Sequence, residues 1–275
     1  MTPTHASSAE PVASGYAPIN GLKMYYEIRG SGKPLVYIHP FVGHASVNPF
    51  RLLAEGRRLI AFDRQGHGRT EDIDRPFSFE QDAEDAAALM QYLNIERADV
   101  FGESFGGIIA TLLAIHHPEL VERVAIYGSA LSKIQDVTSP EALAELRSLT
   151  PDHDSVRFQR ENYQQVAPHP ERWPELFYKR PHWDGLTHEQ LRSIAAPLLI
   201  VAGDHDSLAP RLEHMVDMLR IIPNAQLAVV PNAGHFVFND EPEKVTRILM
   251  RFFDYPISTV PFATTKTGYH PGKTR

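Results

Sequence analysis

The chain has no cysteine, no long apolar run and no excess of basic charge. Without cysteine it can form no disulfide, no thiolate metal site and no cysteine nucleophile. Its longest apolar stretches, such as residues 108–115 and 198–202, are far shorter than the roughly 18 to 20 residues of a membrane-spanning helix. Lysine and arginine number 27 against 34 aspartate and glutamate, a net charge of −7. We therefore expect neither a membrane span nor a nucleic-acid partner, and composition leaves the oligomeric state open.

The first 17 residues are rich in serine, threonine, proline and alanine, and they contain neither a basic leader nor the apolar segment of a secretory signal. We expect residues 1–17 to form a flexible arm and the protein to be cytoplasmic. A signal peptide already removed from the chain is the alternative. The remaining length suffices for one large domain with its own core.

Hydrophobic patterning predicts the fold class. Residues 21–30 alternate apolar and polar side chains after an Asn20-Gly21 turn, which indicates an antiparallel edge hairpin. Short continuous apolar runs follow, as is typical of parallel strands covered on both faces. These runs are residues 35–38, 59–62, 99–101, 124–127, 198–201 and 227–230, with helical patterns at 78–93, 108–116, 211–221 and 242–253. The alternation predicts an α/β fold with a mostly parallel, doubly wound sheet.

The alternation stops over residues 129–194, where helical patterns lie among prolines and aromatic residues. We expect this segment to be a helical cap inserted into a core formed by residues 18–128 and 195–254. Residues 255–275 contain three prolines and show no periodicity, so we expect an irregular C-terminal tail without an assigned role.

The sequence Gly102-Glu103-Ser104-Phe105-Gly106 follows one apolar run and opens an apolar helix, which is the context of a G-x-S-x-G nucleophile elbow. Such a sharp turn needs glycine at positions 102 and 106, because side chains there would collide with the neighbouring strand and helix. The Ser104 hydroxyl would then lie at a helix N-terminus, where partial positive charge favours a developing anion. The alternative is a serine that only caps the helix.

A serine hydroxyl needs a base, and His235 is the best placed of the 14 histidines because it closely follows the last apolar run. The imidazole needs a carboxylate to hold one tautomer and to stabilise its charged form. Asp206 and Asp204 both follow the run at 198–201. We favour Asp206, and the unused acid would be a turn former.

Ser104, Asp206 and His235 in this order, with the elbow and Gly203-Asp204-His205-Asp206 before Pro210, resemble the α/β-hydrolase superfamily. The chain is similar in particular to its small esterases, lactonases and cofactor-free haloperoxidases, over about residues 21–254. The resemblance implies Asp206 as the acid of the triad. The chain has neither a dinucleotide fingerprint nor metal-ligand spacing, so we expect no cofactor and no metal.

The resemblance also implies an oxyanion hole formed by the backbone N–H groups of Phe41 and Phe105. Here the sequence departs from the family, because Pro40 follows His39 where the family most often has glycine. Proline has no N–H, so the loop can work only if the donor is Phe41. Residues 63–70 resemble a glycine-rich turn of the family, and we expect its Arg64 and His67 to be structural.

Aromatic residues are expected to form the substrate pocket. Phe41, Phe105 and Phe236 flank the proposed chemistry, and we expect His44 at its mouth. The cap contributes further aromatic residues, of which we expect Trp173 and Trp183 to bind substrate as part of a lid. The cap set is Phe158, Tyr163, Trp173, Phe177, Tyr178 and Trp183. The alternative is that these rings only pack the cap against the core.

Serine at the nucleophile position argues against relatives that need aspartate there. We therefore expect a serine hydrolase that cleaves small, largely apolar esters or lactones through an acyl-enzyme intermediate. Two alternatives use the same triad: a hydrolase of carbon–carbon bonds in diketones, and a perhydrolase in which peroxide replaces water. An alternative of another class is a ligand receptor with vestigial hydrolase activity.

Overall fold

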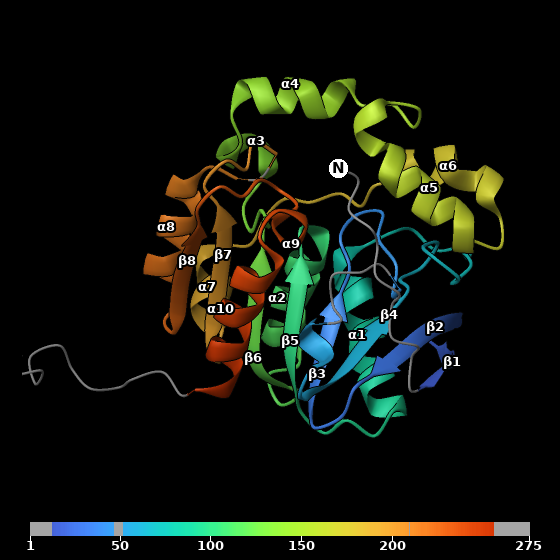
Figure 1. The fold of residues 1–275 in the computed structure, drawn as a ribbon, viewed down its shortest axis with the longest axis horizontal. Helices are drawn as coiled ribbons and strands as arrows, with labels where there is room; N and C mark the ends of the chain where they lie inside the picture. The colour runs from blue at the N-terminus through green and yellow to red at the C-terminus, as the bar shows by residue number, and fades with distance from the viewer. Residues whose placement is uncertain (1–12, 47–51, 209, 256–275) are drawn as a thin grey trace, which may run out of the picture.

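A computed structural model of the chain describes residues 13–46, 52–208 and 210–255. Eight strands form one sheet in the order β1-β2-β4-β3-β5-β6-β7-β8 (Figure 1). Strands β1 and β2 run antiparallel to their neighbours, and the remaining strands pair in parallel. The strands are β1 Ala13–Ile19, β2 Leu22–Arg29, β3 Lys33–Ile38, β4 Arg57–Phe62, β5 Ala98–Glu103, β6 Val121–Tyr127, β7 Leu198–Gly203 and β8 Ala225–Val230. The predicted mostly parallel α/β sheet is confirmed.

The predicted edge hairpin is present, and its first strand begins earlier in the chain than expected. Asn20 and Gly21 both have positive φ, 47° and 87°, as a tight two-residue hairpin turn requires. Strand β1 precedes this turn, and its residues 13–17 are paired with β2. The expectation that residues 13–17 belong to a flexible arm is therefore wrong. The reason is that Ala17 and Ile19 alternate into the core and are almost fully buried. Residues 1–12 lie outside the described part.

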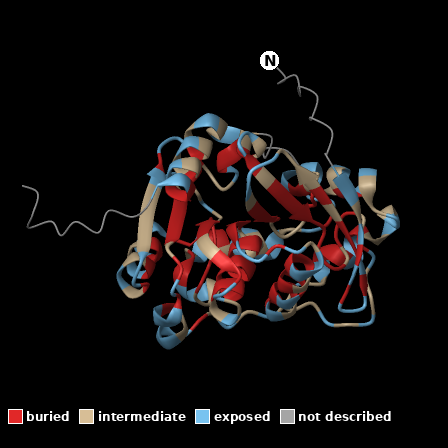
Figure 2. Ribbon diagram, turned by 90° about the horizontal axis from the view of Figure 1, so that it is seen from below, coloured by how far each residue is buried: buried red, intermediate tan, exposed pale blue. Residues whose placement is uncertain are grey.

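Helices cover both faces of the sheet, which explains the continuous apolar runs. One core cluster joins strand residues such as Val100 and Ile126 to α1 Phe79–Tyr92, α2 Phe105–His116 and α8 Leu212–Ile221. A second cluster joins the opposite strand face to α9 Val237–Asp240 and α10 Pro242–Asp254, with the short helix η1 Leu52–Ala54. Figure 2 shows the buried residues concentrated in the strands and on the helices beside them. Strand β8 is only half-buried because it is an edge strand.

The segment between β6 and β7 is helical. It contains α3 Ile134–Val137, α4 Pro140–Ser148, α5 Arg157–Val166, α6 Trp173–Tyr178 and α7 His188–Ser193, with the short helices η2 Asp154–Val156 and η3 Pro170–Arg172. Helices α4, α5 and α6 lie above the carboxyl ends of the parallel strands (Figure 1). Helix α7 instead packs beside the sheet, because its Leu191 is buried in the first core cluster. The predicted tail at residues 256–275 lies outside the described part.

No helix within residues 13–46, 52–208 and 210–255 combines the length and apolar character needed to span a membrane.

A buried ion pair connects the sheet to its last helix. The Arg57 side chain is 2% exposed, and its guanidinium lies 2.5 Å from the Asp99 carboxylate, which is 1% exposed. A second guanidinium nitrogen contacts Asp254 at the end of α10. Burial raises the pKa of Asp99 and the Arg57 charge opposes that rise. Removing the Arg57 side chain would therefore leave the buried Asp99 carboxylate without its positively charged partner.

We predict that Arg57→Met lowers the free energy of unfolding by about 3 to 5 kcal/mol, since breaking a buried pair from one side leaves an uncompensated charge. Urea denaturation followed by circular dichroism measures it. Arg97→Met is the matched control: its pair with Glu122 is solvent-exposed, so it should cost less than about 1 kcal/mol. Equal losses in the two variants would contradict the special role of the Arg57 pair.

Candidate active site

The turn from β5 to α2 holds Ser104 in a strained conformation, with φ 53° and ψ −116°. Such a φ is rare for a residue with a side chain. A Cβ at Gly106 would lie 2.0 Å from the Ile38 carbonyl oxygen, and one at Gly102 would lie 2.1 Å from the Gly106 carbonyl oxygen. The predicted need for both glycines is confirmed. The Ser104 side chain makes no capping hydrogen bond, which argues against the serine being only a helix cap.

The loops after β7 and β8 bring His235 and Asp206 together. The His235 Nδ1 atom lies 2.9 Å and 3.2 Å from the two Asp206 carboxylate oxygens. The Asp206 side chain is 4% exposed and that of His235 14%. Asp204 instead pairs with His205 at 2.7 Å and accepts a hydrogen bond from the Ala233 N–H. The geometry therefore pairs Asp206 with His235 and gives Asp204 a role in shaping the loop.

Neighbouring carboxylates control the proton affinity of His235. Burial by itself would lower the pKa of His235, but the Asp206 carboxylate, with a further contribution from Glu103, raises it above its ordinary value. Glu103 lies directly before Ser104, is 7% exposed and accepts a hydrogen bond from the Tyr37 hydroxyl at 3.3 Å. Burial raises the pKa of Glu103 to about 7. Sequence reasoning treated Glu103 only as the variable residue of the elbow, because its burial is a tertiary property.

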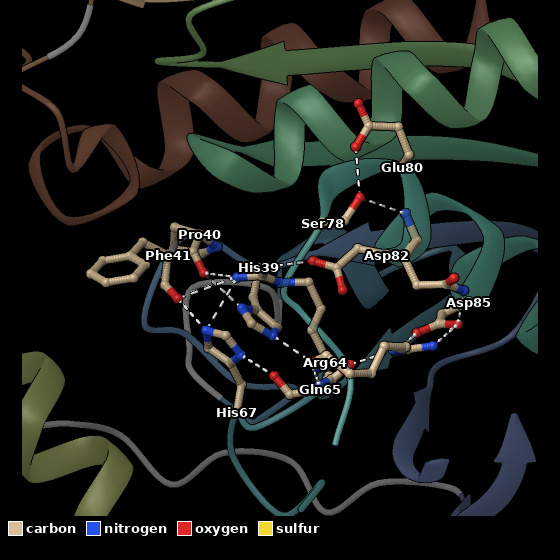
Figure 3. Close-up of polar contacts among 12 residues, drawn as sticks. His39, Pro40, Phe41, Arg64, Gln65, His67, Ser78, Glu80, Asp82 and Asp85 are labelled. Atoms are coloured by element: carbon tan, nitrogen blue, oxygen red, sulfur yellow. Dashed lines mark hydrogen bonds and ion pairs between the residues drawn. The ribbon is translucent and has the colours of Figure 1, made fainter. Parts of the chain in front are cut away.

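The loop after β3 is held through its carbonyl groups (Figure 3). Arg64 donates hydrogen bonds to the carbonyl oxygens of Pro40 at 3.0 Å and Phe41 at 3.2 Å, while its other terminal nitrogen pairs with Asp82 at 2.8 Å. The His67 Nε2 atom also lies 2.5 Å from the Phe41 carbonyl oxygen. Burial and the Arg64 charge lower the pKa of His67 to about 3, so its ring is neutral.

The loop after β3 is also the one expected to provide the Phe41 N–H as an oxyanion donor. The peptide bond before Pro40 is trans, since no cis bond occurs in the described ranges. No acceptor in the described part of the chain is hydrogen-bonded to the Phe41 N–H. The Phe105 N–H is the first of helix α2, where amide groups have no partner within the helix. Arg64 and His67 thus hold the loop by its carbonyl oxygens and leave the Phe41 N–H without a partner among the described residues, which agrees with the structural role expected for them.

Ser104 and His235 line the same cavity of about 370 Å³, which lies between the core and the cap helices. Its volume is within the range of small-molecule sites. Among the residues predicted to bind substrate, Phe41, Phe105, Trp183 and Phe236 line it. Phe177, one of the cap aromatic residues considered for a lid, also lines it. Apolar residues that sequence reasoning had not placed here are Val42, Phe79, Ile108, Ile134, Leu146, Leu149, Val156 and Leu208.

Two residues predicted to bind substrate are not in the cavity lining. Trp173 is 1% exposed, packs against Tyr163 and Phe177, and donates its indole N–H to the Pro151 carbonyl at 2.8 Å. It stabilises the cap from inside. His44 is 5% exposed and accepts the Ser46 N–H, because the loop folds it under the surface. Burial lowers the pKa of His44 to about 4.

Arg180 is a cavity residue that the sequence did not reveal. It lies in the Lys179-Arg180-Pro181-His182 stretch after α6, where the sequence gives no periodicity to indicate which basic residue faces inward.

Comparisons with known proteins agree with the fold. A profile described as the alpha/beta hydrolase family matches residues 35–248. The human protein named serine hydrolase BPHL is 27% identical over 87% of each chain. The 2-hydroxymuconate semialdehyde hydrolase of Pseudomonas sp. (strain CF600) is 31% identical over 78% of this chain and 85% of that protein. The solved meta-cleavage product hydrolase from Pseudomonas fluorescens IP01 is 25% identical, with a TM-score of 0.71 over 88% of this chain and 97% of that one.

We predict that Glu103→Gln lowers the pKa of His235, because the ionised form of Glu103 stabilises the imidazolium and glutamine cannot ionise. Proton and nitrogen NMR of the imidazole across a pH series measures it. Asp204→Asn is the control, since Asp204 is bonded to His205 and not to His235. An unchanged or raised His235 pKa in Glu103→Gln would contradict the assigned coupling.

Proposed function

This chain belongs to the alpha/beta hydrolase family, and we propose that it is a serine hydrolase that cleaves esters or lactones of small, largely apolar substrates through an acyl-enzyme intermediate. One observation carries the proposal. Ser104, at a strained elbow, and His235, paired with Asp206, open onto one predominantly apolar cavity.

In the proposed reaction the Ser104 Oγ attacks the substrate carbonyl carbon while His235 Nε2 accepts the hydroxyl proton. Asp206, at Nδ1, keeps the proton of the neutral ring on that nitrogen and stabilises the imidazolium. The N–H groups of Phe41 and Phe105 donate to the oxyanion, and losing one such donor typically costs about a hundredfold to a thousandfold in rate. His235 then protonates the leaving alcohol. Finally it deprotonates the water that releases the acid.

We predict that Ser104→Ala lowers kcat by about 10⁴-fold or more on a short aryl ester, because the nucleophile is lost. Intact mass spectrometry of quenched wild-type enzyme should show an adduct of the acyl mass, absent from the Ser104→Ala variant. Wild-type turnover by Ser104→Ala would exclude this nucleophile.

The two acids of the β7 loop provide a matched pair. Asp206→Asn should lower kcat by about 10³- to 10⁴-fold, since the amide no longer holds the productive tautomer. Asp204→Asn should retain activity within a few-fold. A larger loss of kcat in Asp204→Asn than in Asp206→Asn would reverse the assignment.

The raised pKa of His235 places the acid limb of the kcat/KM profile against pH above the ordinary histidine value, because the basic form of His235 is lost as pH falls through that pKa.

A second candidate is cleavage of carbon–carbon bonds in diketone substrates with the same triad. It is favoured by the similarity to proteins named as hydrolases of meta-cleavage products and of 2-hydroxymuconate semialdehyde. The two candidates differ in the bond broken. Measuring kcat/KM for a ring-cleavage diketone beside an aryl ester discriminates between them, and the substrate with the higher kcat/KM identifies the reaction.

A further inference from the structure

The side chains that line the cavity at Ser104 include a positively charged arginine, although the chain as a whole carries a net negative charge. It adjoins a second cavity of about 350 Å³, and the two share Ile134, Leu146, Leu149, Phe177 and Arg180 in their walls. Among the described lining residues of both cavities there is no aspartate or glutamate, whereas Arg180 and Arg147 contribute positive charge. The chain as a whole has a net charge of −7. The side chains that line the two cavities around Arg180 therefore favour an anion over a cation.

Arg180 is held at the cavity wall by aromatic rings. Its guanidinium lies 4.7 Å from the ring centroid of Phe41 and 5.0 Å from that of Phe177. Its Nε donates to the Phe177 carbonyl oxygen at 3.3 Å. Both rings therefore attract the guanidinium by cation–π interaction and hold it at the wall.

No carboxylate of the described residues pairs with Arg180, and its two terminal nitrogens make no hydrogen bond to that part of the chain. The neighbouring basic residues differ in this respect. Arg172 pairs with Glu175 at 2.7 Å, and Lys179 pairs with Asp72 at 2.5 Å. The basic residues that flank α6 on both sides, Arg172 and Lys179, are thus paired with carboxylates, whereas Arg180 lines the cavity without such a partner among the described residues.

An unpaired guanidinium against apolar walls is a site for an anion. Partial burial lowers the pKa of Arg180, which reflects the unfavourable desolvation of its charge. A carboxylate would offset that cost, because the planar fork of arginine donates two parallel hydrogen bonds to two carboxylate oxygens. Apolar surroundings strengthen this attraction relative to water.

We propose that Arg180 is a specificity-determining residue that selects substrates with an apolar body and a carboxylate remote from the bond that is cleaved. This inference rests on the proposed ester hydrolysis and narrows its substrate class. Phe41 carries both the stacked guanidinium and the proposed oxyanion donor, so the carboxylate site and the acyl site share one wall.

The test compares two para-nitrophenyl esters of equal chain length, the monoester of suberic acid and the octanoate. The measured quantity is the ratio of their kcat/KM values. Arg180→Gln should lower the ratio of anionic to neutral ester at least tenfold, and Arg180→Lys should lower it less because the charge remains. Arg192→Gln, on the surface of α7, removes the same charge outside both cavities and should leave the ratio unchanged. An unchanged ratio in Arg180→Gln, or an equal fall in Arg192→Gln, overturns the proposal.

Binding separates this inference from the reaction on which it rests. Suberate is titrated into the Ser104→Ala protein and into the same protein with Arg180→Gln, with tryptophan fluorescence as the signal because Trp183 lines the cavity. At least tenfold weaker binding of suberate in the double variant supports the carboxylate site, whether or not the esters are hydrolysed. If neither ester is hydrolysed by the wild-type protein, only the proposed ester hydrolysis is rejected. Equal affinities in the two proteins overturn the carboxylate site and leave ester hydrolysis unaffected.

Discussion

The close contact between the backbone of Gly106 and the carbonyl group of Ile38 is the constraint on which the site depends. Helix α2 can begin directly after Ser104 only because Gly106 has no side chain between the helix and the end of β3. The same contact places the start of α2 beside the loop that continues from Ile38 into His39 and Phe41. One backbone approach therefore sets the position of Ser104, the proposed nucleophile, relative to the proposed oxyanion donors. The strained φ of Ser104 is maintained by the sheet around it.

Charge in this protein is controlled by burial and partners, and histidine shows it most clearly. His67 and His235 both lie in buried loops at the carboxyl ends of strands. Burial and then the Arg64 charge lower the pKa of His67, whereas Asp206 pairs with His235 and raises the pKa of His235 against the effect of burial. The first ring is thereby neutral and suited to supporting the Phe41 loop. The second can accept and hold a proton, as a general base must.

The sequence predicted the core and the elbow well because these features are encoded locally. Continuous apolar runs and an NG turn determine strands, and a glycine on either side of Ser104 determines the elbow. The choice between Asp204 and Asp206 could not be made from spacing alone, since both acids lie in one loop. Resemblance to the family favoured Asp206, and its distance to His235 agrees with that choice.

The cap residues were harder to predict because their roles depend on packing across distant segments. Trp173 and Trp183 are ten positions apart in one polar and aromatic stretch, and their patterns do not distinguish them. The Trp173 indole donates to Pro151 within the cap, whereas the Trp183 indole donates to Ala130 beside the strand ends and its ring lines the cavity. Likewise, residues 13–17 are mostly small and carry no strong strand pattern, and only pairing with β2 shows them to be a strand.

The division between core and cap also determines how selectivity can arise. In the proposed reaction the core supplies Ser104, His235 and Asp206, which would act on any acyl carbon, and none of them would distinguish the remote end of a substrate. The apolar cavity would accept a neutral chain with little discrimination, since one methylene more or less is worth only about 1 to 3 kcal/mol. A carboxylate in the same cavity is costly without a partner and favourable with one. A single cation placed by the cap, Arg180, would therefore discriminate between substrates of the proposed reaction more strongly than the many apolar residues around it.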